Sequence, residues 1–249
     1  MDAIATYALR LGDDSLILGQ RLSEWCGHAP ALEVDLSLAN VALDQVGQAT
    51  HFLTLAGELE GKGRDGDALA FRRDVMDFTN CLLVEQPNGD FAQTIARQLL
   101  FSHYQELLFT ALMGSKNATI AAIAAKAVKE TSYHATLASD WVVRLGDGTD
   151  ESKARMVAGL DWMWRFADEL FVMDEVDAAA IKAGVGVDKA SLRAAWETRI
   201  DAVLADATLT RPAPRRATTG GRVGRHSEHL GHLLSDMQFL QRAYPGATW

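Results

Sequence analysis

Apolar residues recur at intervals of three and four positions along most of the chain, which is the spacing of one face of an α-helix. One such stripe runs from Ile120 to Trp141. The five prolines leave residues 31–86 and 88–211 free of the strongest helix breaker. Alternating β-branched runs, which are typical of strands, are nearly missing from both stretches. The pattern therefore predicts an all-α protein.

Breaks at glycine and proline divide this helical pattern into segments. Asp90 stands just before the third long stripe, where its carboxylate can cap a helix N-terminus. Long helices with mostly short connections are typical of an antiparallel four-helix bundle. We therefore expect residues 1–249 to form a single helical domain. The expected core helices are about 12–27, 32–59, 91–113 and 119–145, with extra helices at about 150–183 and 188–206, a basic loop at 207–225 and a C-terminal helix at about 227–242.

Ionisable residues interrupt the stripes that should face the core. Glu130 and His134 lie on the stripe of the fourth helix, and Glu106 lies on that of the third. Asp44 belongs to a polar strip beside the apolar face of the second helix. Burying such groups without partners costs several kcal/mol, roughly. We therefore predict a buried polar network that joins Glu130, His134 and Asp44, and Tyr133 is a further candidate for it.

Carboxylates and histidines inside a four-helix bundle are how ferritin-like di-iron proteins hold their metals, with Glu from two helices and Glu-x-x-His from the other two. Here Gly47 stands three residues after Asp44, and Tyr133 stands three residues after Glu130. The inner stripe of the first helix carries no carboxylate. We therefore expect no metal and no catalytic residue in this chain. The residues interpreted as a buried polar remnant of a di-iron site are Asp44, Glu106, Glu130 and His134.

A rival interpretation remains open, because Glu130 and His134 are four residues apart and can touch one ion on the same helix face. On that interpretation the protein is a self-sufficient metal-dependent oxygenase with one or two irons. Its ligands are then Glu106, Glu130, His134 and Asp44.

Charge and composition exclude several classes of protein. The formal net charge is -9, whereas a general nucleic-acid binder needs a positive surface. No stretch approaches the roughly 20 apolar residues of a membrane span, and residues 1–4 do not begin a secretory signal. Cys26 and Cys81 are far apart in sequence and are expected to be buried free thiols. A cytoplasmic protein is the expectation.

The basic loop holds five arginines and no acidic residue between positions 211 and 225. Such a group can steer an acidic partner or the phosphates of CoA, and the alternative is a solvated loop. The residues expected to dock a partner are Arg211, Arg215, Arg216, Arg222 and Arg225.

Three histidines cluster at the start of the last predicted helix. They are His226, His229 and His232, with Glu228 among them. No other cluster in the sequence converges on them, so capping and partner contact are favoured over metal binding. Ser227 is the expected N-cap of this helix.

Eleven short stretches and Asp44 carry a resemblance to a known family, and they follow one another over nearly the whole chain. They are RLSEWCGHAP at 21–30, LAN at 38–40 with Asp44, GQA at 47–49, LVEQPNGDFA at 83–92 with IARQ at 95–98, KE at 129–130 with YH at 133–134, LGDGTD at 145–150, TGG at 219–221, HSEHLG at 226–231 and MQ at 237–238. With them the chain resembles the PaaC family, a subunit of the bacterial ring 1,2-phenylacetyl-CoA epoxidase.

This resemblance implies a ferritin-like fold and a non-catalytic structural role in aerobic phenylacetate degradation. It implies that the chain binds and stabilises a related catalytic subunit, PaaA, which carries the di-iron centre and binds the CoA thioester. A small subunit joins the assembly, and a reductase with flavin and iron–sulfur groups supplies electrons. No cofactor is then expected in this chain, and no nucleic acid or membrane is expected among its partners.

Overall fold

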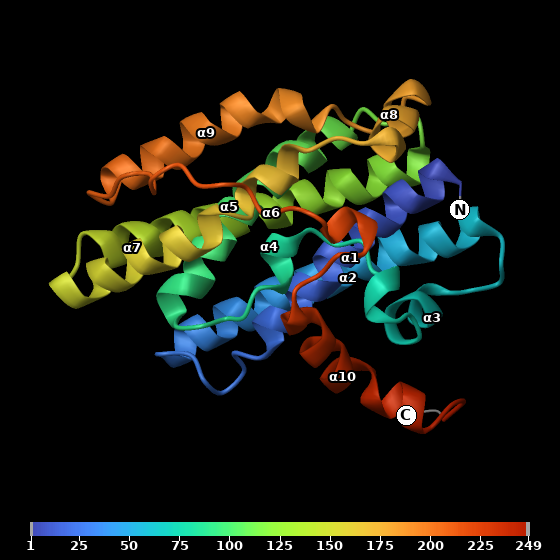
Figure 1. The fold of residues 1–249 in the computed structure, drawn as a ribbon, viewed down its shortest axis with the longest axis horizontal. Helices are drawn as coiled ribbons and strands as arrows, with labels where there is room; N and C mark the ends of the chain where they lie inside the picture. The colour runs from blue at the N-terminus through green and yellow to red at the C-terminus, as the bar shows by residue number, and fades with distance from the viewer. Residues whose placement is uncertain (1, 248–249) are drawn as a thin grey trace. The chain divides into compact units, whose positions relative to one another are not determined.

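The computed structural model describes residues 2–247, which form helices joined by loops and contain no strand (Figure 1). The all-α prediction is therefore confirmed for this part of the chain. The chain divides into two compact units, residues 1–87 with 220–249 and residues 88–219. The prediction that all 249 residues form one domain stays a prediction.

The first unit is built on two long antiparallel helices, α1 (Ala3–Ser23) and α2 (Leu32–Glu60). Glycines on α1 let the two helices approach closely, because a Cβ on Gly12 would lie 2.7 Å from Leu53 Cδ2 and a Cβ on Gly19 would lie 3.0 Å from Val46 Cγ2. The remaining elements of the unit are α3 (Gly66–Phe71), η1 (Val75–Asp77), α4 (Leu82–Glu85), η3 (Gly221–Val223) and α10 (Glu228–Ala243).

The second unit is built on another long pair, α5 (Phe91–Leu112) and α6 (Ala118–Gly146), in which α5 is buried over most of its length. Asp90 caps α5 as expected, since its side chain accepts a hydrogen bond from the Gln93 amide at 2.9 Å. Trp196 donates from its indole nitrogen to the carbonyl of Leu100 at 2.9 Å, which fixes α9 on α5. The remaining elements are α7 (Asp150–Trp164), η2 (Ala167–Phe171), α8 (Glu175–Lys182) and α9 (Lys189–Asp206).

Several predicted boundaries were wrong. The first helix covers 3–23 rather than 12–27, and the single helix expected over 150–183 is three elements, α7, η2 and α8. The new start at α8 comes from Asp174, whose side chain accepts hydrogen bonds from the amides of Val176 and Asp177. A capping box therefore divides a stretch that has no proline. Cys26 is exposed, and only Cys81 is buried as expected.

No helix within residues 2–247 combines the length and the apolar character that crossing a membrane requires.

Candidate functional site

Two of the predicted remnant residues are carboxylates in the second unit, and each has a basic neighbour. Glu106 on α5 accepts a hydrogen bond from Arg199 on α9 at 2.6 Å. Glu130 on α6 lies 3.8 Å from the amine of Lys126, one helical turn earlier. Both carboxylate side chains keep about one fifth of their surface exposed, 21% and 19%. They therefore lie at the edge of the core, where arginine and lysine charges balance them.

The other two remnant residues differ in burial. His134 on α6 is 1% exposed, as the stripe predicted, and its ring meets that of the half-exposed Tyr133 at 6.2 Å between centroids. Asp44 is partly exposed on α2, in the first unit. A network joining Asp44 to Glu130 and His134 stays a prediction.

The described residues do not assemble a metal site. Nowhere in residues 2–247 are three His, Cys, Asp or Glu side chains placed so that they could hold one ion. The ion pair between Glu106 and Arg199 also occupies a carboxylate that a di-iron site would use. That this chain holds no metal remains a prediction.

A histidine that the sequence analysis did not single out lies one turn before Glu106. His103 is 9% exposed, and its Nε2 lies 2.9 Å from Ser139 Oγ. That hydroxyl donates to the carbonyl of Ala135 at 2.7 Å, so Nε2 carries the proton and donates to Ser139. Burial, with a smaller contribution from the charge of Arg199, lowers the pKa of His103 to about 4. His103 is therefore neutral at pH 7 and acts as a structural hydrogen-bond donor.

A group of buried ion pairs in the first unit was missed by sequence reasoning. We call it the buried ionic cluster, and its acidic part begins with Asp13 and Asp14 on α1, which are 0% and 4% exposed. Arg73 binds Asp13 through both terminal nitrogens, one of them at 3.0 Å. Arg222 binds Asp14 in the same way, at 3.0 and 2.7 Å. Such two-point pairs are among the strongest hydrogen bonds in proteins. The whole cluster consists of Asp13, Asp14, Arg73, Glu85, Arg222 and His226.

The third carboxylate of the cluster, Glu85 on α4, is 0% exposed and accepts hydrogen bonds from three residues. Asn80 Nδ2 donates at 2.9 Å, and Ser227 donates from its amide at 2.6 Å and from its hydroxyl at 2.8 Å. His226 Nδ1 lies 2.7 Å away. Both carboxylate oxygens of Glu85 therefore have hydrogen-bond partners.

His226 is held in its charged form. Its second nitrogen, Nε2, lies 2.9 Å from the carbonyl of Phe78, which can only accept, while Nδ1 faces the Glu85 carboxylate. Both ring nitrogens therefore donate, which requires an imidazolium. Burial works to lower the pKa of His226, but the hydrogen bond to Glu85, the charges of Glu85 and Asp13 and the Phe78 carbonyl together raise it.

Glycines shape the segment that carries Arg222 and His226 to the cluster. A Cβ on Gly221 would lie 2.1 Å from the carbonyl oxygen of Asn80, so only glycine fits there. Gly224 has a φ of +73° and lies against the Met76 carbonyl, where a Cβ would be at 2.4 Å. The cluster thus fastens the start of the C-terminal segment to α1 and α4. Ser227 takes the N-cap position of α10 as expected, although its hydroxyl binds Glu85 instead of the helix.

The five arginines predicted to dock a partner have different environments. Docking was wrong for Arg222, whose guanidinium is buried against Asp14. Arg211 pairs with Asp201 at 2.6 Å, and Arg215 pairs with Asp161 at 2.6 Å, both within the second unit. The loop looked unbalanced in sequence because these acids lie outside it, on α9, which precedes it, and on α7. Arg216 and Arg225 are exposed, and for them docking stays a prediction.

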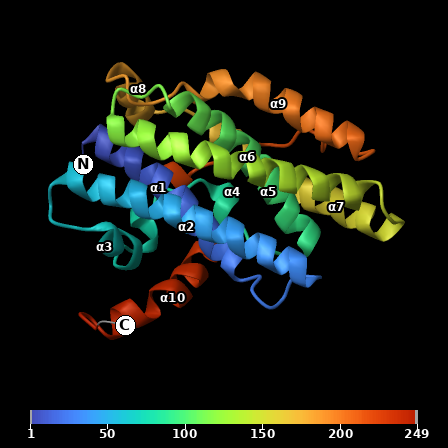
Figure 2. The same ribbon diagram turned by 180° about the vertical axis from the view of Figure 1, so that it is seen from behind.

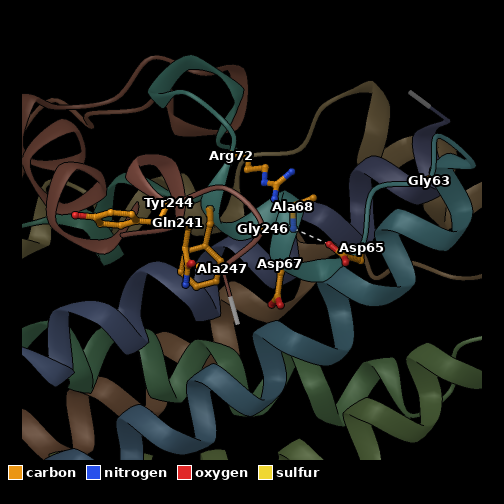
Figure 3. Close-up of a pocket in the computed structure, with 10 residues that line it drawn as sticks. Gly63, Asp65, Asp67, Ala68, Arg72, Gln241, Tyr244, Gly246 and Ala247 are labelled. Atoms are coloured by element: carbon orange, nitrogen blue, oxygen red, sulfur yellow. Dashed lines mark hydrogen bonds between the residues drawn. The ribbon is translucent and has the colours of Figure 1, made fainter. Parts of the chain in front are cut away.

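A surface pocket of about 360 Å³ lies in the first unit, between α3 and the C-terminal residues (Figure 3). Its Asp65 carboxylate accepts a hydrogen bond from the Ala68 amide at 2.8 Å and so serves as the N-cap of α3. This pocket brings together no set of buried polar groups that would select a ligand.

Comparison with known proteins decides the family. A family model described as phenylacetic acid catabolic protein, PaaA_PaaC, matches residues 1–249. The chain is also 52% identical over 249 residues to the C subunit of 1,2-phenylacetyl-CoA epoxidase from Escherichia coli (strain K12), and the match covers 100% of both chains. The chain belongs to the phenylacetic acid catabolic protein family. The resemblance drawn from the sequence is thereby confirmed.

In this family member, three of the stretches that carried the resemblance meet in the first unit. Arg21, from the first stretch, donates to the carbonyl of Glu85 at 3.0 and 2.9 Å and to the carbonyl of His229 at 3.0 Å. Residues 83–92 supply Glu85, and residues 226–231 supply His226 and Ser227. The stretches thus share a structural task, which is to hold the C-terminal segment in place.

The charge on His226 predicts a stability that declines with rising pH. The pKa of His226 is higher in the folded chain than the value of about 6.5 expected in the unfolded chain. The contribution of charged His226 to the free energy of unfolding is therefore complete below pH 6.5 and is lost as the pH rises through the folded pKa. We expect wild type to lose stability relative to His226→Gln between pH 6.5 and 9, by at most about 1.4 kcal/mol per pH unit. Urea unfolding at each pH measures this difference, and parallel stability curves would contradict it.

His103 predicts the opposite dependence. His103 takes up a proton near pH 6.5 in the unfolded chain but only near pH 4 in the folded chain. The contribution of neutral His103 to the free energy of unfolding is therefore complete above pH 6.5 and is lost as the pH falls toward 4. We expect His103→Asn to lose less stability than wild type between pH 7 and pH 5 in urea unfolding. His28→Asn, at an exposed histidine, is the matched control and should follow wild type.

Proposed function

We propose that this chain is a non-catalytic structural subunit of a multicomponent phenylacetyl-CoA epoxidase in phenylacetate degradation, where it binds and stabilises the di-iron catalytic subunit. The observation that carries the proposal is the full-length match, 52% identical, to a protein that is named as a subunit of that epoxidase. A subunit designation implies an assembly, and the match leaves no part of either chain outside the comparison.

The electrostatics of the second unit support the non-catalytic part of the proposal. Glu106, which would have to ligate iron, forms an ion pair with Arg199 at 2.6 Å. A cation bound there would compete with a guanidinium already in place. By sequence spacing Gly47 and Tyr133 stand where the di-iron pattern calls for histidines. Neither position lies in the core, because Gly47 is open on the outside of α2 and the Tyr133 side chain is 50% exposed.

The proposed fold is a ferritin-like antiparallel four-helix bundle with additional helices. Its support is the pair of long antiparallel hairpins, α1 with α2 and α5 with α6, one in each unit. Two such hairpins supply the four helices that a bundle of this type requires.

The partners we propose are the related catalytic subunit PaaA, which holds the di-iron, and the small subunit and reductase of the same complex. The proposed location is the cytoplasm, and no cofactor is assigned to this chain. The exposed members of the predicted docking arginines are Arg211, Arg215, Arg216 and Arg225.

Two measurements test the proposal together. Co-expression with the catalytic subunit should give one complex in size-exclusion chromatography, and the chain purified alone after expression with iron should contain far less than one iron per chain. Glu106→Gln is the matched variant, and its iron content should equal that of wild type.

Separate elution of the two chains at micromolar concentration would overturn the structural role. Near-stoichiometric iron that falls in Glu106→Gln, together with oxygen consumption when a reductant is supplied, would instead establish the self-sufficient oxygenase with Glu106, Glu130, His134 and Asp44 as ligands.

A further inference from the structure

One face of α2 exposes apolar side chains over residues 32–43. Leu32, Leu36 and Leu43 are 71%, 57% and 69% exposed. They are separated by four and seven residues, which places them on one line along a helix. The line continues through smaller uncharged residues and is about 33 Å long at about 1.5 Å per residue. This surface, the α2 outer stripe, consists of Leu32, Leu36, Leu43, Gly47, Thr50 and Thr54.

Within residues 2–247, no contact of Gly47 explains why this position is a glycine. A Cβ on Gly47 would meet nothing within 4 Å, whereas a Cβ on Gly57 of the same helix would lie 2.1 Å from the Arg64 carbonyl oxygen. Glycine within a helix is less stable than alanine, because it loses more backbone freedom on folding. A glycine at an open helical position therefore indicates close approach by something outside the chain.

The flank of the stripe is acidic. Glu33, Asp44 and Glu58 lie about 80 to 120° around the helix from Leu32, as follows from about 3.6 residues per turn. The helix contains no lysine or arginine over residues 32–60. A partner that covers the leucines must therefore carry basic residues beside its own apolar face.

The same charges argue against a second copy of this chain as the occupant. Two copies that met through this stripe would place acid beside acid, in a protein whose formal net charge is already -9. The length of the stripe fits a long helix of a helical partner better than it fits a loop or a small ligand. The family model carries the names of two related kinds of chain, PaaA and PaaC, so a related helical chain has the required form.

We propose that the α2 outer stripe is the surface on which the related catalytic subunit docks, through a helix whose apolar face is flanked by lysine or arginine and which packs closely over Gly47. This inference rests on the proposed function and assigns it a surface. Figure 2 lets the reader follow α2 alongside α1 in the first unit.

The experiment measures the dissociation constant of the purified full-length chain for the catalytic subunit by calorimetry, with the melting temperature of each variant measured alone. Leu36→Glu and Leu43→Glu change exposed side chains, so the melting temperature should stay at the wild-type value. Each should weaken binding by more than about tenfold. Phe239→Glu on α10, where the side chain is 63% exposed, is the matched control and should bind as wild type.

Gly47→Ala separates docking from folding, because its two effects have opposite signs. For the chain alone we expect the melting temperature to rise by about 2 to 4 °C. Binding to the catalytic subunit should weaken, since a methyl group then stands where the partner helix approaches. Glu33→Lys and Glu58→Lys should also weaken binding, because they reverse the charge on the flank.

The outcomes distinguish this inference from the proposed function. If wild type binds and the Leu36, Leu43 and Gly47 variants bind equally well, the docking surface is wrong while the proposed function stands. If wild type does not bind, the proposed function is overturned and this inference with it. If wild type alone is a dimer that Leu43→Glu converts to a monomer, the stripe belongs to a second copy and the inference is wrong.

Discussion

Three carboxylates, Asp13, Asp14 and Glu85, are almost completely removed from water in the first unit, and the arrangement around them follows from that burial. A buried charge without a partner costs several kcal/mol, roughly, so each of the three must meet a cation or several donors. Arg73 supplies the partner of Asp13 from 60 positions further along the chain. Arg222 pairs with Asp14 and His226 pairs with Glu85, and both partners lie more than 130 positions away in sequence. These two pairs hold the start of the C-terminal segment against α1 and α4.

This requirement changes the meaning of the basic loop. Arg222 and His226 belong to a region in which several arginines are followed by histidines, and this composition predicts a solvent-exposed segment. In the structure they neutralise acids from α1 and α4, and the glycines at 221 and 224 allow the backbone to come close enough for that. The resemblance stretches at 21–30, 83–92 and 226–231 are therefore connected by hydrogen bonds and ion pairs in the first unit.

In the second unit, two of the residues first interpreted as a remnant of a metal site also have partners of opposite charge. Glu106 and Glu130 lie at the edge of the core beside Arg199 and Lys126, so their charges are balanced by the protein itself. The proposed structural role fits these pairs and directs attention to the outer surfaces. One such surface lies on α2, where exposed leucines, an open glycine and an acidic flank lie side by side. These features fit a partner helix with an apolar face and basic residues beside it.

The sequence by itself determined the helical class, the long helices near 32–60, 91–112 and 118–146, the cap at Asp90 and the family, because periodicity, capping and motif order are local properties of the chain. From Gly47 and Tyr133 the sequence also predicted that the chain holds no metal, which stays a prediction. Only the tertiary structure decided which charges meet. Two adjacent aspartates within an apolar helix were the available signal for the cluster, but their partners lie about 60 and 210 positions away, and pairings over such distances are set by packing. The pairing of Arg215 was also beyond the sequence, since its partner Asp161 lies on α7, a helix distant in the chain. The division of 150–183 has a local cause, the capping box at Asp174, and that signal was missed in the sequence.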